Sequence, residues 1–158
     1  MIFITVGTHP QQFNRLLAEV DRLIEKGRIK VKVFAQSGYS TYRPKNYSWE
    51  NFLTDEDYNG KIKAADIIIT HSGAGSIITA LSQRKKLIIV PRLSKFGEHT
   101  NDHQIDLARK IKEKNLGEAV FDVSDLEKAI KGAKAKNIKS TKKRLITEIR
   151  NFLNYELS

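Results

Sequence analysis

The sequence predicts an α/β fold: a single Rossmann-like domain with a mostly parallel sheet and helices on both faces of the sheet. Short apolar runs such as "IIIT" (67–70) and "LIIV" (87–90) alternate with segments whose apolar residues recur at helical spacing. Strands of a parallel sheet are buried on both faces, so they read as continuous Val, Ile and Leu runs. The length of 158 residues suits one compact domain of this kind.

The expected strands end at residues that interrupt a sheet. The first apolar run ends at Gly7, the second before Ser37 and Gly38, and a later one at Pro91. The segment 47–52 can hold one more short strand. We expect the other strands at 2–6, 30–36, 67–70, 86–91 and 118–123.

The expected helices carry apolar residues on one face. Thr8 and Gln11 have the spacing of a capping box, which places the start of the first helix beside Thr8, and Gly27 ends that helix. The acids of "DED" (55–57) suit the first turn of the next helix, because carboxylates stabilise the positive end of the helix dipole. We expect helices at about 9–26, 55–66, 75–84, 102–114, 124–131 and 140–156.

Positive charge is concentrated at the C-terminus. The formal net charge is +10, and residues 134–158 carry half of it, with seven Lys or Arg against two Glu. We therefore divide the chain into a domain over 1–133 and a basic C-terminal helix over 134–158, which packs on the domain or on a partner. The excess predicts attraction to nucleic acid or to the cytoplasmic face of a membrane. A solvated basic tail is the alternative.

Composition excludes several other classes of protein. The chain has no cysteine, which excludes a disulfide framework and a Cys-based zinc site. No apolar run approaches the roughly 18 residues that span a bilayer. Met1 leads directly into a buried-strand pattern without a basic region or a cleavage site. We therefore expect no signal peptide and a cytoplasmic protein.

Small residues follow two of the predicted strands. "THSGAGS" (70–76) joins a strand to a helix, and Gly7-Thr8 lies in the same position after the first strand. Ligands of open parallel sheets bind at the carboxyl ends of the strands, and the free amides at a helix N-terminus favour phosphate. Two such turns at one sheet edge suit a diphosphate or a nucleotide. The alternative is that Gly73 and Gly75 only permit a tight turn.

Other nucleotide and metal motifs fit less well. "GAGSII" (73–78) lacks the third glycine of the dinucleotide fingerprint, and no Gly-Lys-Ser/Thr of a P-loop occurs. "DED" (55–57) is similar to a metal-binding carboxylate pair, but it equally suits a helix start. His99 and His103 are four residues apart without an HExxH pattern. We therefore predict neither a metal nor a cofactor.

Three segments taken together resemble the donor-binding domain of GT-B glycosyltransferases of family 28. They are "ITHSGAGSI" (69–77), "KKLIIVPR" (85–92) and "FGEHTNDHQIDLA" (96–108), in this order and spacing. "TVGTHPQQFNRLL" (5–17) resembles the start of the catalytic subunit of the eukaryotic two-subunit UDP-N-acetylglucosamine transferase of dolichol-oligosaccharide synthesis. "GTHPQQF" (7–13) and "FGEHTNDHQ" (96–104) resemble the bacterial capsule and exopolysaccharide counterparts. The similarity covers roughly residues 1–122, half of a GT-B fold.

The resemblance implies a UDP-sugar donor and a set of residues that bind it. The "HSGAGS" amides would hold the diphosphate, the first glycine turn would lie beside the donor, and the "HQ" pair would hold the donor sugar. The implied substrate-binding residues are Gly7, Thr8, His71, Ser72, Gly73, Ala74, Gly75, Ser76, Thr79, His103 and Gln104. At Thr79 family members usually have Glu or Asp for the ribose hydroxyls, so a neutral hydroxyl there implies looser donor binding.

The implied chemistry is inverting transfer without a required metal. A base deprotonates the acceptor hydroxyl, and the leaving-group charge falls on the glycine-loop amides. His9 is the candidate base, although it can equally be a residue of the capping turn, and Glu98, in the loop beside the donor, is the second catalytic candidate.

The resemblance implies a glycosyltransferase subunit that adds a sugar to an undecaprenyl-diphosphate-linked saccharide in capsule or exopolysaccharide synthesis. The acceptor half of the GT-B cleft would come from a membrane-anchored partner subunit, which would hold the protein at the inner face of the cell membrane. Three alternatives stay open. They are a non-catalytic donor-binding or scaffolding subunit, a basic nucleic-acid-binding module and, more distantly, a sugar-nucleotide epimerase. The module is disfavoured because the basic residues are not interleaved with aromatics.

Overall fold

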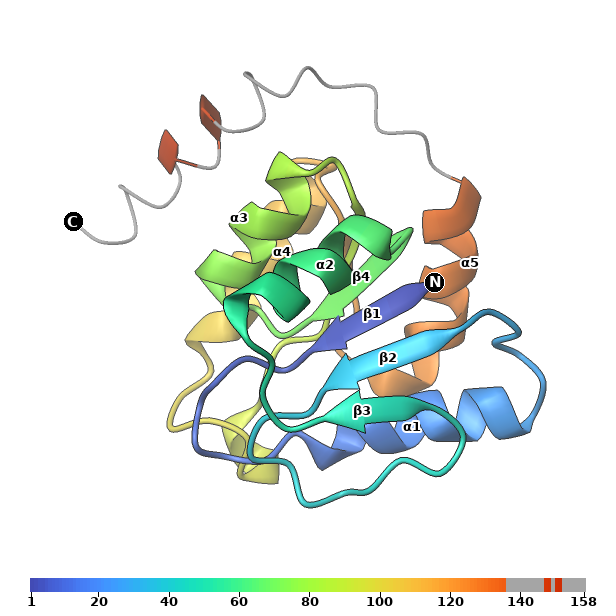
Figure 1. The fold of residues 1–158 in the computed structure, drawn as a ribbon. Helices are drawn as coiled ribbons and strands as arrows, with labels where there is room; N and C mark the ends of the chain where they lie inside the picture. The colour runs from blue at the N-terminus through green and yellow to red at the C-terminus, as the bar shows by residue number, and fades with distance from the viewer. Residues whose placement is uncertain (136–146, 149, 152–158) are drawn as a thin grey trace.

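The computed structural model describes residues 1–135, 147–148 and 150–151 (Figure 1). Within these residues, six strands form one parallel sheet in the order β3-β2-β1-β4-β5-β6. The strands are β1 (Ile2–Thr5), β2 (Val33–Gln36), β3 (Ser48–Glu50), β4 (Ile67–Thr70), β5 (Lys86–Ile89) and β6 (Glu118–Ala119). The order reverses between β1 and β4, which is the doubly wound arrangement with its ligand crevice at the reversal.

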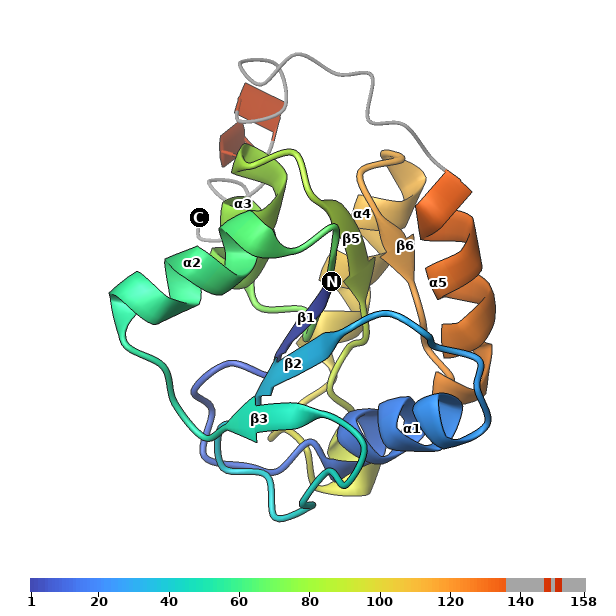
Figure 2. The same ribbon diagram turned by 45° about the vertical axis from the view of Figure 1, so that its right-hand side comes forward.

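Helices cover both faces of the sheet, which confirms the predicted fold class. They are α1 (Asn14–Glu25), α2 (Asp55–Ala64), α3 (Ala74–Ser82), α4 (His103–Glu113) and α5 (Leu126–Ala135). Helices α1 and α5 pack on one face, and α2, α3 and α4 on the other (Figures 1 and 2).

Alternation along each strand explains why both faces are apolar. In β1, Ile2 and Ile4 belong to the core cluster under α1 and α5, whereas Phe3 points to the opposite cluster. The same division occurs in β4, where Ile68 lies on the face of Phe3. Every residue of these two strands is buried, so a run such as "IIIT" supplies core residues to two helical layers at once.

The first helix begins later than the capping-box spacing predicts. Residues 8–13 are not helical, and α1 starts at Asn14 with Phe13 as its N-cap. The amide of Phe13 donates to Ser40 Oγ at 2.9 Å, and Asn14 Oδ1 accepts from the amide of Thr41. The capping-box prediction is therefore wrong: Thr8 and Gln11 precede the helix, and the first helical amide, that of Asn14, donates to Gln12 Oε1 at 2.7 Å.

Most other bounds agree with the predictions. Helices α2, α3 and α4 begin and end within two residues of the expected positions, and the short strand within 47–52 is β3. The last strand, β6, stops at Ala119 instead of continuing to residue 123.

The C-terminal prediction falls mostly on residues outside the described part of the chain. Helix α5 continues through Ala135, so it crosses the expected boundary between 133 and 134. Of the helix expected at 140–156, the structure describes residues 147–148 and 150–151, which are helical. Within the described part of the chain, no helix is long and apolar enough to cross a membrane.

Candidate functional site

The sequence-predicted site residues follow the carboxyl ends of β1, β4 and β5. These ends lie at the left of the sheet in Figure 1, where the loops after β1 and β4 flank the reversal of strand order. Gly7 lies on one side of the reversal and the segment 71–76 on the other. A crevice between these loops is the position where open parallel sheets bind ligands.

The imidazole of His71 fills the space between the two glycine turns. A Cβ atom placed on Gly73 would lie 2.1 Å from His71 Nε2, and one placed on Gly7 would lie 2.5 Å from His71 Cε1. Gly7 has a φ of 75°, a conformation that favours glycine, whereas Gly73 is an ordinary extended residue with a φ of −87°. The imidazole of His71 therefore approaches the backbone so closely that both positions require glycine.

His71 is buried and neutral. Thr70 Oγ1 donates to the carbonyl oxygen of Thr5 at 3.1 Å and lies 3.3 Å from His71 Nδ1. Because the hydroxyl proton is used on Thr5, we assign the ring proton to Nδ1, so that the Nε2 lone pair faces Gly73. Burial lowers the pKa of His71 to about 4, and the charge of Arg92 acts in the same direction.

Because the imidazole of His71 is buried, the free energy of unfolding should depend on pH in the acidic range. Unfolded His71 takes up a proton near its ordinary pKa of 6.5, whereas the folded ring resists protonation down to a pKa of about 4. The unfolded state binds more protons in this window, so the free energy of unfolding should fall as the pH drops from 6.5 to 4. The contribution of His71 to this loss should be at most about 3 kcal/mol.

Urea unfolding at stepped pH checks this prediction. The variant His71→Asn should have a smaller acid-dependent slope than the wild type between pH 6.5 and pH 4, because the contribution of His71 is removed. His103→Asn, at an exposed position, should keep the wild-type slope. An unchanged slope in His71→Asn would show that another group causes the acid sensitivity.

The N-terminus of α3 lies beside the reversal of strand order and has no side-chain cap. Its N-cap, Gly73, makes no side-chain cap hydrogen bond, and Ala74 and Gly75 begin the helix. Ser72 is buried, and its Oγ has no hydrogen-bond partner among the described residues. A buried hydroxyl without a partner beside free helix amides is a feature that an anionic ligand satisfies.

The next turn of α3 is more closely tied to the protein. Ser76 Oγ accepts a long hydrogen bond of 3.4 Å from Tyr58 on α2. Thr79 Oγ1 donates to the carbonyl oxygen of Gly75 at 2.9 Å, so its proton is already used. A ribose hydroxyl could still donate to Thr79 Oγ1, but Thr79 could not donate in return without breaking this bond.

His9 stacks on a histidine from another loop. The ring centroids of His9 and His99 lie 4.4 Å apart at an interplanar angle of 26°, and His9 Nδ1 accepts from the amide of Gln11. Partial burial, followed by the charges of His99 and Arg92, lowers the pKa of His9 below its ordinary value. His9 is therefore neutral at pH 7, as a general base must be. The side chain of Thr8, the preceding residue, is exposed.

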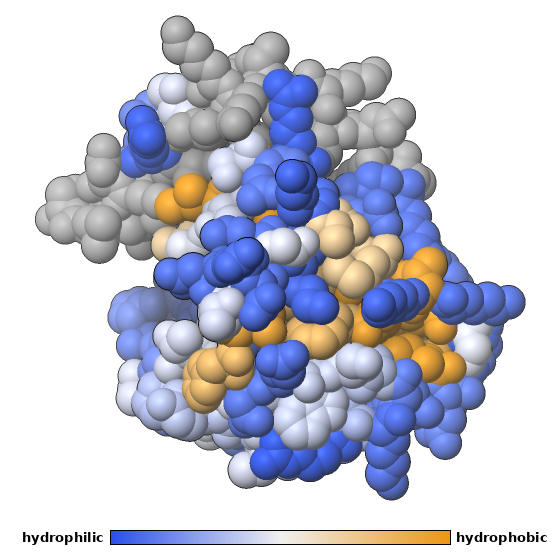
Figure 3. Space-filling model, in the orientation of Figure 1, coloured by the Kyte–Doolittle hydropathy of each residue, from blue (hydrophilic) through white to orange (hydrophobic). Residues whose placement is uncertain are grey.

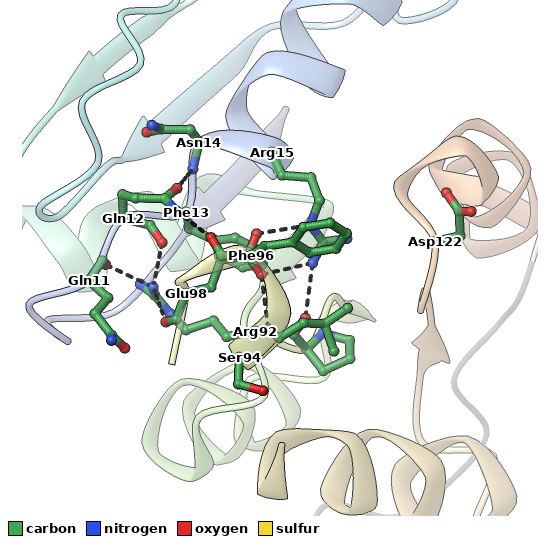
Figure 4. A network of polar contacts seen from close by, with 12 residues as sticks. Gln11, Gln12, Phe13, Asn14, Arg15, Arg92, Ser94, Phe96, Glu98 and Asp122 are labelled. Carbon is green, nitrogen blue, oxygen red and sulfur yellow. Dashed lines mark hydrogen bonds and ion pairs between the residues drawn. The ribbon is translucent and has the colours of Figure 1, made fainter. Parts of the chain in front are cut away.

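The structure does not leave Glu98 free to act as a base. Its side chain is completely buried, and both carboxylate oxygens accept from the Arg15 guanidinium, at 2.9 and 3.0 Å (Figure 4). The Oε2 atom also accepts from the amide of Leu93. We interpret Glu98 as the residue that fixes the loop after β5, because its lone pairs are engaged within the protein.

The "HQ" pair begins α4. Gln104 Oε1 accepts from the amide of Arg92 at 3.0 Å, which ties the side chain to the end of β5. The amide of His103 donates to Asn101 Oδ1, and its side chain is exposed. The structure thus places Gln104 against the loop after β5 and leaves the imidazole of His103 in solvent.

Sequence reasoning missed an exposed aromatic pair at the same sheet edge. Tyr39 follows β2 and Phe52 follows β3, and their rings pack edge to face at 5.0 Å while remaining 55% and 45% exposed. Gly38, beside Tyr39, packs against the backbone of Gly7. Two large exposed apolar residues in loops after adjacent strands are the signal that could have indicated a contact surface.

In Figure 3, apolar residues reach the surface in separate patches among polar ones.

The acidic run at 55–57 acts as a helix start. Thr54 Oγ1 accepts from the amide of Asp57 at 3.1 Å and donates to its carboxylate at 2.8 Å. No group of three His, Cys, Asp or Glu among the described residues is arranged to hold a metal ion. The capping interpretation of "DED" accounts for these contacts.

Comparison with known proteins identifies the family. The model of the glycosyltransferase family 28 C-terminal domain matches residues 1–153. The chain belongs to this family. UDP-N-acetylglucosamine transferase subunit ALG13 of Homo sapiens is 30% identical over 119 residues, and the Mus musculus protein of the same name is 28% identical over 121 residues. These alignments cover 70% and 69% of the chain but only 10% of each relative.

Solved glycosyltransferases have the same fold. The glycotransferase of kitacinnamycin superposes with a TM-score of 0.67 at 16% identity, covering 95% of this chain and 38% of that chain. The calicheamicin glycosyltransferase CalG4 gives 0.63 at 16% identity, covering 97% and 38%. MurG of Acinetobacter baumannii gives 0.57 at 16% identity, covering 92% and 43%. These neighbours are GT-B glycosyltransferases, which confirms the predicted fold.

Proposed function

We propose that the protein binds a UDP-sugar and transfers the sugar, with inversion, to a lipid-diphosphate-linked saccharide. The observation that carries this proposal is the pair of glycine turns, at Gly7 and Gly73, on either side of His71 at the reversal of strand order. The α3 amides and the unpaired Ser72 hydroxyl can donate to a diphosphate there. Membership of family 28 supports a UDP-sugar as the ligand.

The proposed reaction exchanges two bonds at the anomeric carbon. His9 takes the proton of the acceptor hydroxyl, whose oxygen attacks the anomeric carbon while the bond to UDP breaks. The electron pair of that bond leaves with UDP, and the helix amides at Ala74 and Gly75 stabilise the charge. We propose that this needs no metal ion. The neutral, stacked ring of His9 supports its role as the base.

We further propose that the acceptor is an undecaprenyl-diphosphate-linked saccharide of capsule or exopolysaccharide synthesis. The likeness of "GTHPQQF" (7–13) and "FGEHTNDHQ" (96–104) to bacterial proteins of that kind supports this acceptor. A membrane-anchored partner subunit would supply the acceptor half of the cleft and hold the protein at the inner face of the membrane. The curated relatives are themselves named transferase subunits, which supports a partnered enzyme.

Reconstitution tests the proposal. The chain alone should transfer little or no sugar from a UDP-sugar to a lipid-diphosphate acceptor, and co-expression with the membrane partner should raise transfer at least about tenfold, or about 1.4 kcal/mol of barrier. Deleting residues 140–158 should reduce this gain more than it reduces folding. Full activity of the lone chain would contradict the two-subunit proposal.

A non-catalytic donor-binding subunit is the second candidate, because the Thr79 proton is engaged on Gly75 and gives the ribose no donor. The same reconstitution distinguishes the two candidates. Binding of UDP-sugar without any transfer in the presence of the partner would favour this second function.

Gln104 provides a test of where the donor sugar lies. Gln104→Ala should weaken the binding of UDP-sugar by about 1–2 kcal/mol and the binding of UDP by less, because the loss of the hydrogen bond to the Arg92 amide affects both ligands alike, whereas the hydrogen bond to the sugar is lost only for UDP-sugar. Calorimetric titration of both ligands measures the difference. Gln83→Ala, an exposed position beyond the end of α3, is the matched control and should bind both ligands as the wild type does. An equal loss for UDP and UDP-sugar would place Gln104 at the nucleotide or in the fold.

A further inference from the structure

Arg92 is a completely buried arginine at the end of β5. Its side chain has no exposed surface, and burial lowers the pKa of its guanidinium to about 10, which leaves it charged at neutral pH. Arginine is almost never fully buried unless its charge is compensated. The contacts of this side chain therefore indicate a specific role.

The guanidinium donates to main-chain carbonyl groups of two separate loops (Figure 4). Nη2 donates to the carbonyl oxygen of Val6 at 2.6 Å. Nη1 lies within 2.9–3.1 Å of the carbonyl oxygens of Gln11, Gln12 and Glu98. Three of these acceptors flank the Gly7 turn after β1, and the fourth lies in the loop after β5. One side chain thus joins both loops.

The backbone of the same residue reaches a third part of the site. The amide of Arg92 donates to Gln104 Oε1, at the start of α4. The guanidinium also lies over the ring of Phe13, with Cζ 5.0 Å from the ring centroid. Arg92 therefore contacts both the loop that contains the Gly7 turn and Gln104, the predicted sugar-binding residue.

The charge of Arg92 has no directly bonded carboxylate. Glu98 uses its carboxylate on Arg15 and on the amide of Leu93, and it offers Arg92 only its carbonyl oxygen. Arg15, Glu98 and Arg92 together therefore carry a net positive charge, and Arg92 donates to the carbonyl group of Val6, the residue before Gly7. A buried charge is poorly screened, so it favours an anion in the crevice.

We propose that Arg92 is the positioning residue of the donor site: its buried guanidinium sets the loop after β1, which forms one side of that site, at a fixed separation from the loop after β5, and the binding of a UDP-sugar depends on this separation. The inference rests on the proposed function for the identity of the ligand. The joining of the loops rests only on the contacts of Arg92.

The variant Arg92→Met tests the inference, because methionine fills similar space and offers no donor. Amide hydrogen exchange should accelerate at least tenfold in residues 6–12 and 93–101 together, while β4 and α3 keep their wild-type rates. Calorimetry should show at least a tenfold loss of affinity for UDP-sugar. The NMR titration of His9 should move to higher pH, because a nearby positive charge is removed.

Ile130→Ala is the matched control. Ile130 is a residue of α5 whose side chain is buried in the core, and it is far along the chain from both loops. Its truncation therefore destabilises the fold without removing a loop contact. Below its unfolding transition this variant should keep wild-type loop exchange, donor affinity and His9 titration. The same changes in Ile130→Ala as in Arg92→Met would mean that Arg92 contributes only stability.

Arg92→Lys carries the test if the methionine variant does not fold. Lysine keeps the charge but has three donors for four carbonyl groups, and it lacks the planar fork. Loop exchange should rise and donor affinity should fall at least threefold. Wild-type exchange and affinity in the folded variant would overturn the inference. Absence of donor binding by the wild type would refute the proposed function instead, and the exchange measurement would still decide whether Arg92 joins the loops.

Discussion

Replacing Gly73 with valine should abolish the binding of UDP and of UDP-sugars. Any Cβ at this position would lie 2.1 Å from His71 Nε2, and the ring cannot move away freely because it is buried between Gly7 and Gly73. Valine would therefore displace the imidazole, and with it the two turns that form the crevice. Calorimetry or ligand-observed NMR measures the loss.

Two further variants separate the space needed by His71 from the space needed by phosphate. Gly73→Ala alone should destabilise the fold by about 1–3 kcal/mol through overpacking, and the double variant with His71→Ala should recover part of that loss. Gly75→Ala is the control, because its Cβ would meet nothing within 4 Å and the fold should keep its stability. Wild-type donor binding by Gly73→Val would remove this loop from the site.

Replacing Glu98 with glutamine should destabilise the protein by about 3–5 kcal/mol, because it leaves a mostly buried guanidinium without its anion. The side chain of Glu98 is completely buried and that of Arg15 is only 15% exposed, so water reaches little of the pair and replaces it poorly. Denaturant unfolding measures the change. The result expected for a catalytic base is different, since activity would disappear while stability stayed unchanged.

The matched control is Glu127→Gln at the surface. Glu127 pairs with Lys131 at 2.6 Å, but the two side chains are 29% and 66% exposed, so the variant should change stability far less than Glu98→Gln does. A double-mutant cycle with Arg15→Met should show that the cost of losing Glu98 depends on Arg15. Equal and small effects of both glutamine variants would contradict the buried ion pair as a source of stability.

The sequence predicted where in the fold the candidate site lies, but not how its side chains contact one another. "THSGAGS" (70–76) and Gly7 identify the sheet edge, because glycine between a buried strand and a helix is a local signal. The sequence does not reveal that a histidine ring occupies the gap between them. Nor does it indicate that Glu98 is paired with Arg15, 83 residues away. These contacts depend on how loops from different strands meet.

The sequence by itself determined the sheet and its two helical layers. Apolar runs such as "IIIT" (67–70) must be buried on both faces whatever surrounds them, and helical spacing requires a helix to cover each face. Only the tertiary structure decided the start of α1, where the amide of the N-cap residue Phe13 donates to Ser40 Oγ, 27 residues away along the chain. It alone decided the role of Arg92, which joins carbonyl groups as far as 86 residues away. Burial and periodicity follow from the residues of one segment. Hydrogen-bond partners depend on which donors and acceptors the complete fold brings to within about 3 Å of each other.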